Sequence, residues 1–162
     1  MVETPPAPSA EELRWAQIEK EYPVAAKVWN YLKLCGWNDY VCAGIMGNLM
    51  RETGGDTLNL KPTLYDSSRA YYGICQWSKR YCPEVQGKNL DYQLDYLKTT
   101  IEKEFLTFGK LYKNGFVYWH FTQLTNERDA ALAFAKCYER CSSAGYTKRQ
   151  NNATTAYKYF VG

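Results

Sequence analysis

The segment from Asn38 to Gly55 is the part of the chain that most constrains the fold. Asn38 is a favourable helix N-cap, a mostly apolar run follows it, and the Gly54-Gly55 pair is a strong helix terminator. The sequence therefore predicts a helix with Glu52 in its last turn, where the macrodipole disfavours a carboxylate by roughly 0.3–1 kcal/mol. Partial desolvation there raises a carboxyl pKa, as a general acid near neutral pH requires. The alternative is a solvated glutamate that ends the helix, with its charge partly compensated by Arg51. Taken by itself, this segment favours that alternative.

Length and composition indicate one ordinary globular domain. The 162 residues suffice for a sizeable core, and 46% hydrophobic with 23% charged residues is not the composition of a disordered chain. No apolar run approaches the length of a membrane span, and residues 1–4 lack the basic and apolar regions of a signal peptide. We expect a monomer that leaves its cell by another route, or a piece of a longer protein.

Net charge and aromatic content indicate which classes of molecule the protein can bind. The net charge of +3 is divided between −2 over residues 1–20 and +5 over the remainder. This mild basicity favours an anionic polymer such as a cell wall but is too weak to indicate nucleic acid. Aromatic residues make up 16% of the chain. Their flat rings suit sugar stacking, although core packing is the default for most of them.

The six cysteines permit disulfides without establishing them. No C-x-x-C pair occurs and His120 is the only histidine, so zinc ligands are poorly spaced and we expect neither a metal nor a cofactor. Cys137 and Cys141 lie four residues apart on one predicted helix, a poor geometry for a bridge. We expect mostly buried thiols, and the disulfide state stays open.

Periodicity and turn residues organise the rest of the chain. Residues 1–9 are Pro-rich and, with a short helix over 11–19, form an N-terminal arm over 1–20. Apolar stripes and caps predict further helices over residues 24–32, 38–52, 90–105, 131–141 and 153–160. Residues 54–88 are irregular, with a short hairpin predicted around 71–77. Residues 116–121 suit either a strand or a buried helix.

Two motifs about twenty residues apart carry the functional signal: Arg51-Glu52-Thr53, and Gly73-Ile74-Cys75-Gln76-Trp77. Together they resemble the lysozyme-like superfamily of peptidoglycan glycosidases, and most closely the phage tail lysozyme family. Members carry Ala-Gly-Ile-Met-Gly-Asn-Leu before Glu-Ser, then Gly-Leu-Ala-Gln-Trp and later Phe-Glu-Arg-Pro. This chain has matching residues at 43–49, 52–53, 73–77 and 138–141.

The resemblance covers residues 24–160 and implies a mainly α, lysozyme-like (α+β) catalytic domain over 21–162, with a short irregular or β-hairpin insertion beside the catalytic helix. Three residues depart from the family pattern: Thr53 replaces Ser, Cys75 stands at a small or apolar position, and Cys141 replaces Pro. The stretch between the two motifs is shorter than is usual in the family.

Site roles follow from the resemblance. Glu52 is the general acid, and Asp66 is either a second catalytic carboxylate or a turn former, whereas Asp56 is a turn former. Gln76 orients substrate or water, or else bonds to loop backbone. The remaining candidates for substrate binding are Tyr72, Gly73, Trp77 and Thr53.

Each of these substrate-binding candidates has a structural alternative. Tyr72 and Trp77 either stack on sugar or close the core under the insertion, and Gly73 either allows close backbone approach or forms a turn. We expect Glu139-Arg140 to form a bracing ion pair and His120 to pack as an aromatic residue.

By this resemblance the chain is a muramidase that cleaves glycan strands of peptidoglycan between N-acetylmuramic acid and N-acetylglucosamine, for wall penetration or lysis by a phage or related element. We expect it in a virion tail, or outside the cell at the wall, with other tail or wall-lytic domains as partners. The alternatives are a lytic transglycosylase with the same Glu, a peptidase using Cys75 or Cys82 with His120, and an inactive wall-binding module.

Overall fold

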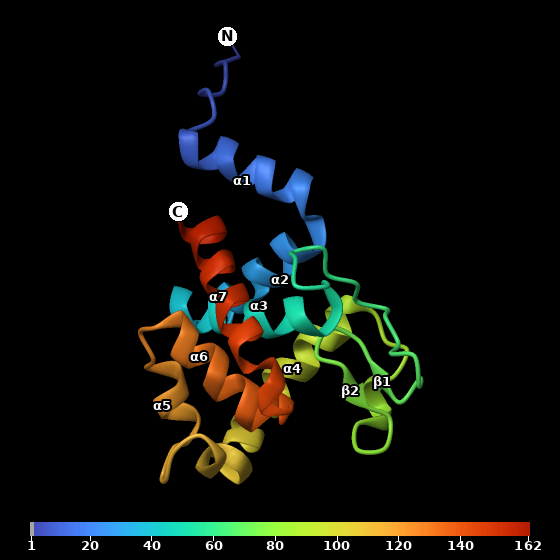
Figure 1. The fold of residues 1–162 in the computed structure, drawn as a ribbon. Helices are drawn as coiled ribbons and strands as arrows, with labels where there is room; N and C mark the ends of the chain where they lie inside the picture. The colour runs from blue at the N-terminus through green and yellow to red at the C-terminus, as the bar shows by residue number, and fades with distance from the viewer. Residues whose placement is uncertain (1) are drawn as a thin grey trace.

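A central buried helix organises the computed structural model, which describes residues 2–162 (Figure 1). This helix, α3 (Asp39–Thr53), is buried at every position from Val41 to Met50. The Asn38 side chain accepts from the Val41 N–H at 2.9 Å, and the Gly54 N–H donates to the Met50 carbonyl at 3.0 Å. The predicted cap and terminator of this helix are therefore confirmed.

Two glycines let the neighbouring helices approach α3 closely. A Cβ on Gly44 would lie 2.5 Å from the Cβ of Ala130 in α6 (Glu127–Phe134). A Cβ on Gly47 would lie 2.5 Å from the Ala153 nitrogen in α7 (Tyr146–Val161). Neither contact leaves room for a side chain, so the Gly-x-x-Gly spacing sets the distance of both helices from α3.

Helix α6 does not end in regular geometry. It begins after Asn126, whose side chain accepts from two backbone N–H groups, as predicted. It then widens into a π-helical turn over Ala135–Glu139 and stops at Arg140, which has a φ of 50°. A π turn holds one residue more than an α turn, and such turns recur at functional sites.

The remaining helices enclose this core. They are α1 (Ala10–Glu21), α2 (Pro23–Leu34), α4 (Leu90–Phe108) and α5 (Tyr118–Thr122). In Figure 1, α1 lies across the end of the body where α7 terminates, and Arg14 of α1 donates to the Phe160 carbonyl at 3.2 Å. Of residues 116–121, the last four are helical in α5 and the first two precede it; Phe121 is the one buried residue of this short helix, so the expectation of a buried helix holds only in part. No helix within residues 2–162 is both long and apolar enough to cross a membrane.

The irregular insertion carries the predicted hairpin, with β1 (Tyr71–Tyr72) antiparallel to β2 (Trp77–Ser78). A single buried side chain of α4, Gln93, fastens this insertion. Its Oε1 accepts from the Ile74 N–H at 2.8 Å, and its Nε2 donates to the carbonyls of Pro62 at 2.7 Å and Lys88 at 2.9 Å. Residues 2–162 therefore form one mainly helical domain with the insertion held against it.

Candidate active site

Glu52 lies in the last turn of α3 with its side chain 15% exposed. Its Oε1 accepts from Nη2 of Arg149 at 2.5 Å. Burial raises the pKa of Glu52, and the opposing charge of Arg149 reduces that rise without cancelling it. The carboxyl is therefore held in one direction and keeps its proton to a higher pH than an exposed glutamate does.

The partner of Glu52 comes from α7, and sequence reasoning missed it. Arg149, only 6% exposed, also donates from Nη1 to Oδ1 of buried Asn48 at 3.0 Å. The available signal was its position: Arg149 falls at helical spacing from Ala153 and Ala156, so it lies on the apolar face of α7. Arg51, the expected neighbour, instead pairs with Asp56 at 2.9 Å.

A second carboxyl enters the same region. The prediction of an ion pair between Glu139 and Arg140 is wrong, because Arg140 pairs with Glu104 of α4. Arg140 takes the left-handed conformation at the end of the π-helical turn, and the Glu139 carboxyl turns inward. Its Oε1 is buried and has no hydrogen-bond partner among residues 2–162. Burial and the charge of Glu52 raise the pKa of Glu139 well above its ordinary value.

One cavity of about 350 Å³ joins these groups. Its lining comes from α3, α7, the insertion, the end of the π-helical turn and the two residues after it: Glu52, Asp66, Tyr71, Gln76, Glu139, Arg140, Cys141 and Arg149. A second hollow of about 250 Å³ shares Tyr71, Gln76, Glu139 and Arg140 with it and extends to Trp77 and Tyr81. The shared lining makes the two hollows one groove with Glu52 in its wall. Glu52, Asp66 and Gln76 are thus brought together.

Asp66 both lines the cavity and forms a turn. Its Oδ1 accepts from the Tyr71 N–H at 3.0 Å, and its Oδ2 accepts from the Ser68 hydroxyl at 2.5 Å. The Ser68 hydrogen bond lowers the pKa of Asp66. Asp66 is therefore an ionised group at the rim with both oxygens already engaged.

Gln76 is held in a conformation that non-glycine residues rarely adopt, with a φ of 51°. Its Nε2 donates to the Leu64 carbonyl at 3.0 Å and to the Gly73 carbonyl at 2.9 Å. Gly73 has a φ of 86°, and a Cβ there would lie 2.5 Å from Oε1 of Gln93. The Gly-x-x-Gln spacing thus fixes the turn between β1 and β2, because glycine accepts without strain a left-handed conformation that other residues rarely adopt.

The family model described as phage tail lysozyme matches residues 23–160. The chain belongs to this family. No curated protein matches it. Membership supports a peptidoglycan-degrading, lysozyme-like role, and that role fits a location in a virion tail or outside the cell.

The aromatic residues at and beside the groove of this phage tail lysozyme family member divide into buried and exposed rings. Tyr72 is 2% exposed and donates to the Lys88 carbonyl at 2.6 Å, and Trp77 is buried and donates to the Tyr138 hydroxyl at 3.0 Å. Both rings close the core under the insertion, which was the structural alternative for them. The rings that reach solvent are those of Tyr71, 46% exposed, and Tyr81, 71% exposed.

Thr53 lies behind the groove of this phage tail lysozyme and does not line it. Its hydroxyl is buried, donates to the Leu49 carbonyl at 3.4 Å and accepts from the Lys61 N–H at 3.3 Å. A hydroxyl at this position therefore joins the end of α3 to the start of the insertion. Serine, the family residue, offers the same group.

The residues of the alternative Cys–His pair lie in different places. Cys75 and Cys82 line the groove, whereas His120 lines a separate hollow with Trp119 and accepts at Nδ1 from the Val117 N–H at 3.1 Å. His120 is exposed, but its ring packs as expected against aromatic neighbours, with ring centroids 5.7 Å from that of Phe116 and 5.4 Å from that of Trp119. Burial raises the pKa of both thiols, for Cys75 well above its ordinary value, and so disfavours the reactive thiolate.

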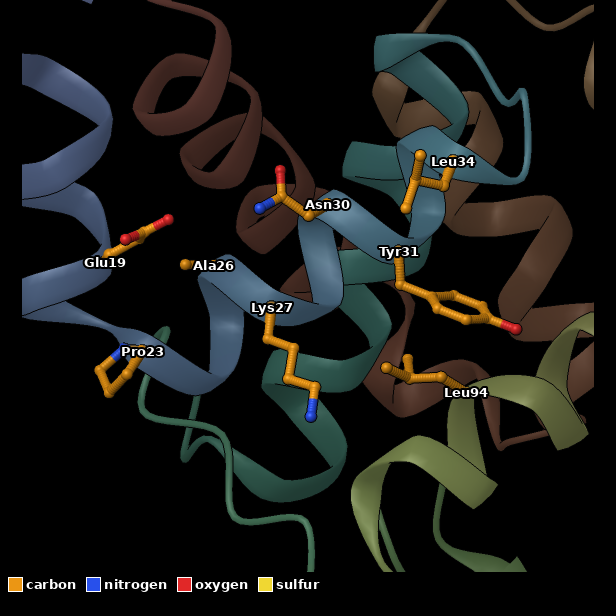
Figure 2. A pocket seen from close by; sticks show the side chains of 8 residues that line it. All are labelled: Glu19, Pro23, Ala26, Lys27, Asn30, Tyr31, Leu34 and Leu94. Carbon is orange, nitrogen blue, oxygen red and sulfur yellow. The ribbon is translucent and has the colours of Figure 1, made fainter. Parts of the chain in front are cut away.

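A wider hollow of about 560 Å³ lies between α1, α2 and α4 (Figure 2). Its polar side chains, including Glu19 and Lys27, are exposed to solvent. No buried acid faces it, so size alone does not mark the site of chemistry in this lysozyme family member. No group of His, Cys, Asp or Glu within residues 2–162 is arranged to hold a metal ion.

Proposed function

We propose that the protein is a muramidase in which Glu52 is the general acid. Glu52 gives its proton to the oxygen between N-acetylmuramic acid and N-acetylglucosamine as the bond from that oxygen to the muramic C1 breaks. Water then adds at C1 and releases one proton. The observation that carries this proposal is a buried carboxyl at the C-terminal end of a helix, open to a groove and with its pKa raised by burial.

The groove supplies groups suited to binding a glycan. The exposed rings of Tyr71 and Tyr81 offer flat surfaces for sugar faces, in place of Tyr72 and Trp77. Gln76 lines both hollows and orients substrate through the amide oxygen that its backbone hydrogen bonds leave available. Arg149 holds the Glu52 carboxyl toward the groove.

The second catalytic group distinguishes hydrolysis from transglycosylation. Asp66 is the candidate for activating water, because it lines the cavity and its lowered pKa keeps it ionised. Both of its oxygens already accept hydrogen bonds in the turn, which favours a rival mechanism that needs no second carboxylate. In a lytic transglycosylase the muramic 6-hydroxyl attacks C1 in place of water.

Purified peptidoglycan treated with the native protein and with Glu52→Gln tests the general acid. We expect the variant to lose roughly 100-fold or more of the rate while keeping its fold, because the amide has no proton to give. Glu102→Gln, an exposed position on α4, is the matched control and is expected to be fully active. A fully active Glu52→Gln would end the proposal, and so would a native protein that binds peptidoglycan without cleaving it.

Mass spectra of the products decide between the two reactions. Reducing N-acetylmuramic acid ends are expected from a muramidase. Anhydro-muramoyl ends would instead establish the transglycosylase, with Glu52 in the same role.

A further inference from the structure

The most exposed tryptophan of the chain lies on α5, away from the groove. Four of the five tryptophans are buried or half-buried, whereas Trp119 is 64% exposed. In Figure 1, α5 lies on the opposite side of the body from the hairpin that borders the groove. Tryptophan is enriched at binding surfaces, because one large ring contributes much apolar contact area and a polar N–H. The surroundings of Trp119 therefore decide what it can bind.

Trp119 lines a hollow of about 390 Å³, and within residues 2–162 no residue lines both this hollow and the groove. Packed rings form one side of the hollow. The centroid of the Phe116 ring lies 4.7 Å from that of Tyr112 and 5.7 Å from that of His120. Phe116 is itself buried, so these rings are held in place. A ligand therefore meets a hollow that is already formed.

Polar groups lie next to the Trp119 ring. Nδ1 of His120 accepts from the Val117 N–H at 3.1 Å, so the neutral imidazole carries its proton on Nε2, which is left to donate to a ligand. The Gln123 amide donates to the neighbouring Thr122 hydroxyl at 3.2 Å and keeps its oxygen as an acceptor. An aromatic face bordered by a donor and an acceptor can stack on a sugar ring while bonding to its hydroxyl and acetamido groups.

The charge of the hollow limits the ligand further. Lys113 contributes the one ammonium group, Asn114 adds an exposed amide, and no Asp or Glu of residues 2–162 lines the hollow. This lining suits a neutral or anionic ligand and disfavours a cationic one. Glycan strands of peptidoglycan meet the requirement, because their sugars carry neutral acetamido groups and their peptide stems carry carboxylates. A strand also repeats the same disaccharide, so it can offer one unit to the groove and another to a second site.

We propose that the hollow beside Trp119 is a second binding site for glycan strands of peptidoglycan, which holds the protein on the wall while the groove engages another stretch of glycan. The proposal takes its substrate from the proposed function but does not depend on which residue is the acid. Two linked sites bind a polymer more tightly than either does alone, because the second binding event becomes intramolecular. The second site therefore matters on an insoluble wall and not on a short soluble fragment.

NMR spectra of the amide and indole N–H groups test the site directly, with chitotetraose, a soluble oligomer of N-acetylglucosamine, as the probe. The Glu52→Gln protein is used so that the probe is not cleaved. We expect the Trp119 indole N–H and the side-chain amides of Asn114 and Gln123 to shift during titration. Adding Trp119→Ala should abolish the two amide shifts. Resonances around Trp119 that stay unmoved, as they would if the hollow bound a protein instead, would overturn the proposal, and so would amide shifts that persist in the Trp119→Ala variant.

Cosedimentation with insoluble peptidoglycan tests the effect on wall binding. Trp119→Ala should bind roughly threefold to tenfold more weakly than the native protein, the loss expected for one stacked ring. Lysis of the insoluble wall should fall by a similar factor, while the rate on soluble glycan fragments stays native. Trp119→Phe keeps a ring and should retain most of the binding. Tyr92→Ala, at an exposed tyrosine outside the hollow, is the control and should match the native protein.

Native binding to the wall by Trp119→Ala would also overturn the proposal. Failure here is separable from failure of the proposed function, because binding is measured without cleavage. A fully active Glu52→Gln would remove the general acid and leave the second site standing. An inactive Glu52→Gln together with native wall binding by Trp119→Ala would remove the second site alone.

Discussion

The backbone of Gly47 in α3 is in direct contact with the backbone of Arg149 in α7. A Cβ on Gly47 would lie 2.5 Å from the Arg149 carbonyl oxygen. The contact places the Arg149 side chain between Asn48 and Glu52, one and five residues further along α3. The glycine is therefore linked to the candidate acid through the spacing of two helices.

Gly47→Ala should weaken both the fold and the site. The added methyl has to push α7 away from α3, and overpacking of this kind costs about 1–3 kcal/mol of the free energy of unfolding. Urea denaturation measures the loss, and lysis of peptidoglycan should fall because Arg149 moves away from Glu52. Gly145→Ala is the control, since a Cβ there meets nothing nearer than Nε of Arg149 at 3.5 Å. Native stability in Gly47→Ala would refute the close contact.

The free energy of unfolding should decrease as the pH rises above the ordinary pKa of a glutamate. Burial raises the folded-state pKa of Glu52 and of Glu139 above the usual 4.5, so between that value and the raised values the folded state binds more protons than the unfolded chain. Their contribution to stability is complete at low pH and is lost as the pH passes through the raised values.

Urea unfolding at a series of pH values from about 5 to 9 measures this dependence. Glu139→Gln should show a shallower decline than the native protein, because one of the two raised groups is gone. The pKa values of Asp66 and Glu84 are lowered, so these groups change the free energy of unfolding only at pH values below this series. They therefore do not hide the decline caused by Glu52 and Glu139. Equal slopes in the two proteins would contradict the raised pKa of Glu139.

Tyr81→Ala should weaken substrate binding without slowing the chemistry. The ring is 71% exposed at one end of the groove, away from Glu52, so its loss removes a stacking surface worth about 1 kcal/mol, or roughly fivefold in KM. The kcat should stay near the native value. Tyr92→Ala, at an exposed tyrosine of α4 outside the groove, is the matched control. A fall in kcat with constant KM would place Tyr81 in the chemistry instead.

The starts of three helices were predictable because they depend on neighbours in sequence, whereas α7 begins at Tyr146, before the predicted residue 153 and without a side-chain cap. Asn38, Asn89 and Asn126 each accept from a backbone N–H two or three residues ahead, so the signal for each helix start lies within one turn. The end of α3 at Gly54 is equally local. The signals for these boundaries therefore lie in residues close by in the sequence.

The partners of Glu52 were not predictable in the same way. Arg149 lies 97 residues away in sequence, and its role appears only when α7 packs on the glycines of α3. The inward direction of Glu139 depends on the π-helical turn, and no local cap or turn residue announces that turn. Regular α geometry is the default for an apolar periodic segment, so the sequence pattern led to the prediction of a bracing ion pair between Glu139 and Arg140.

The π-helical turn also means that the number of residues in the segment that continues α6 decides which way its last side chains point. Side chains follow one another by about 100° around an α-helix, so one residue more or less redirects everything after it. Removing a single residue from Ala135–Glu139 would restore the α register and turn the second carboxyl away from the first. A one-codon deletion within residues 135–137 of this turn would therefore redirect the Glu139 carboxyl in a single evolutionary step while the residues of the family motifs stay the same.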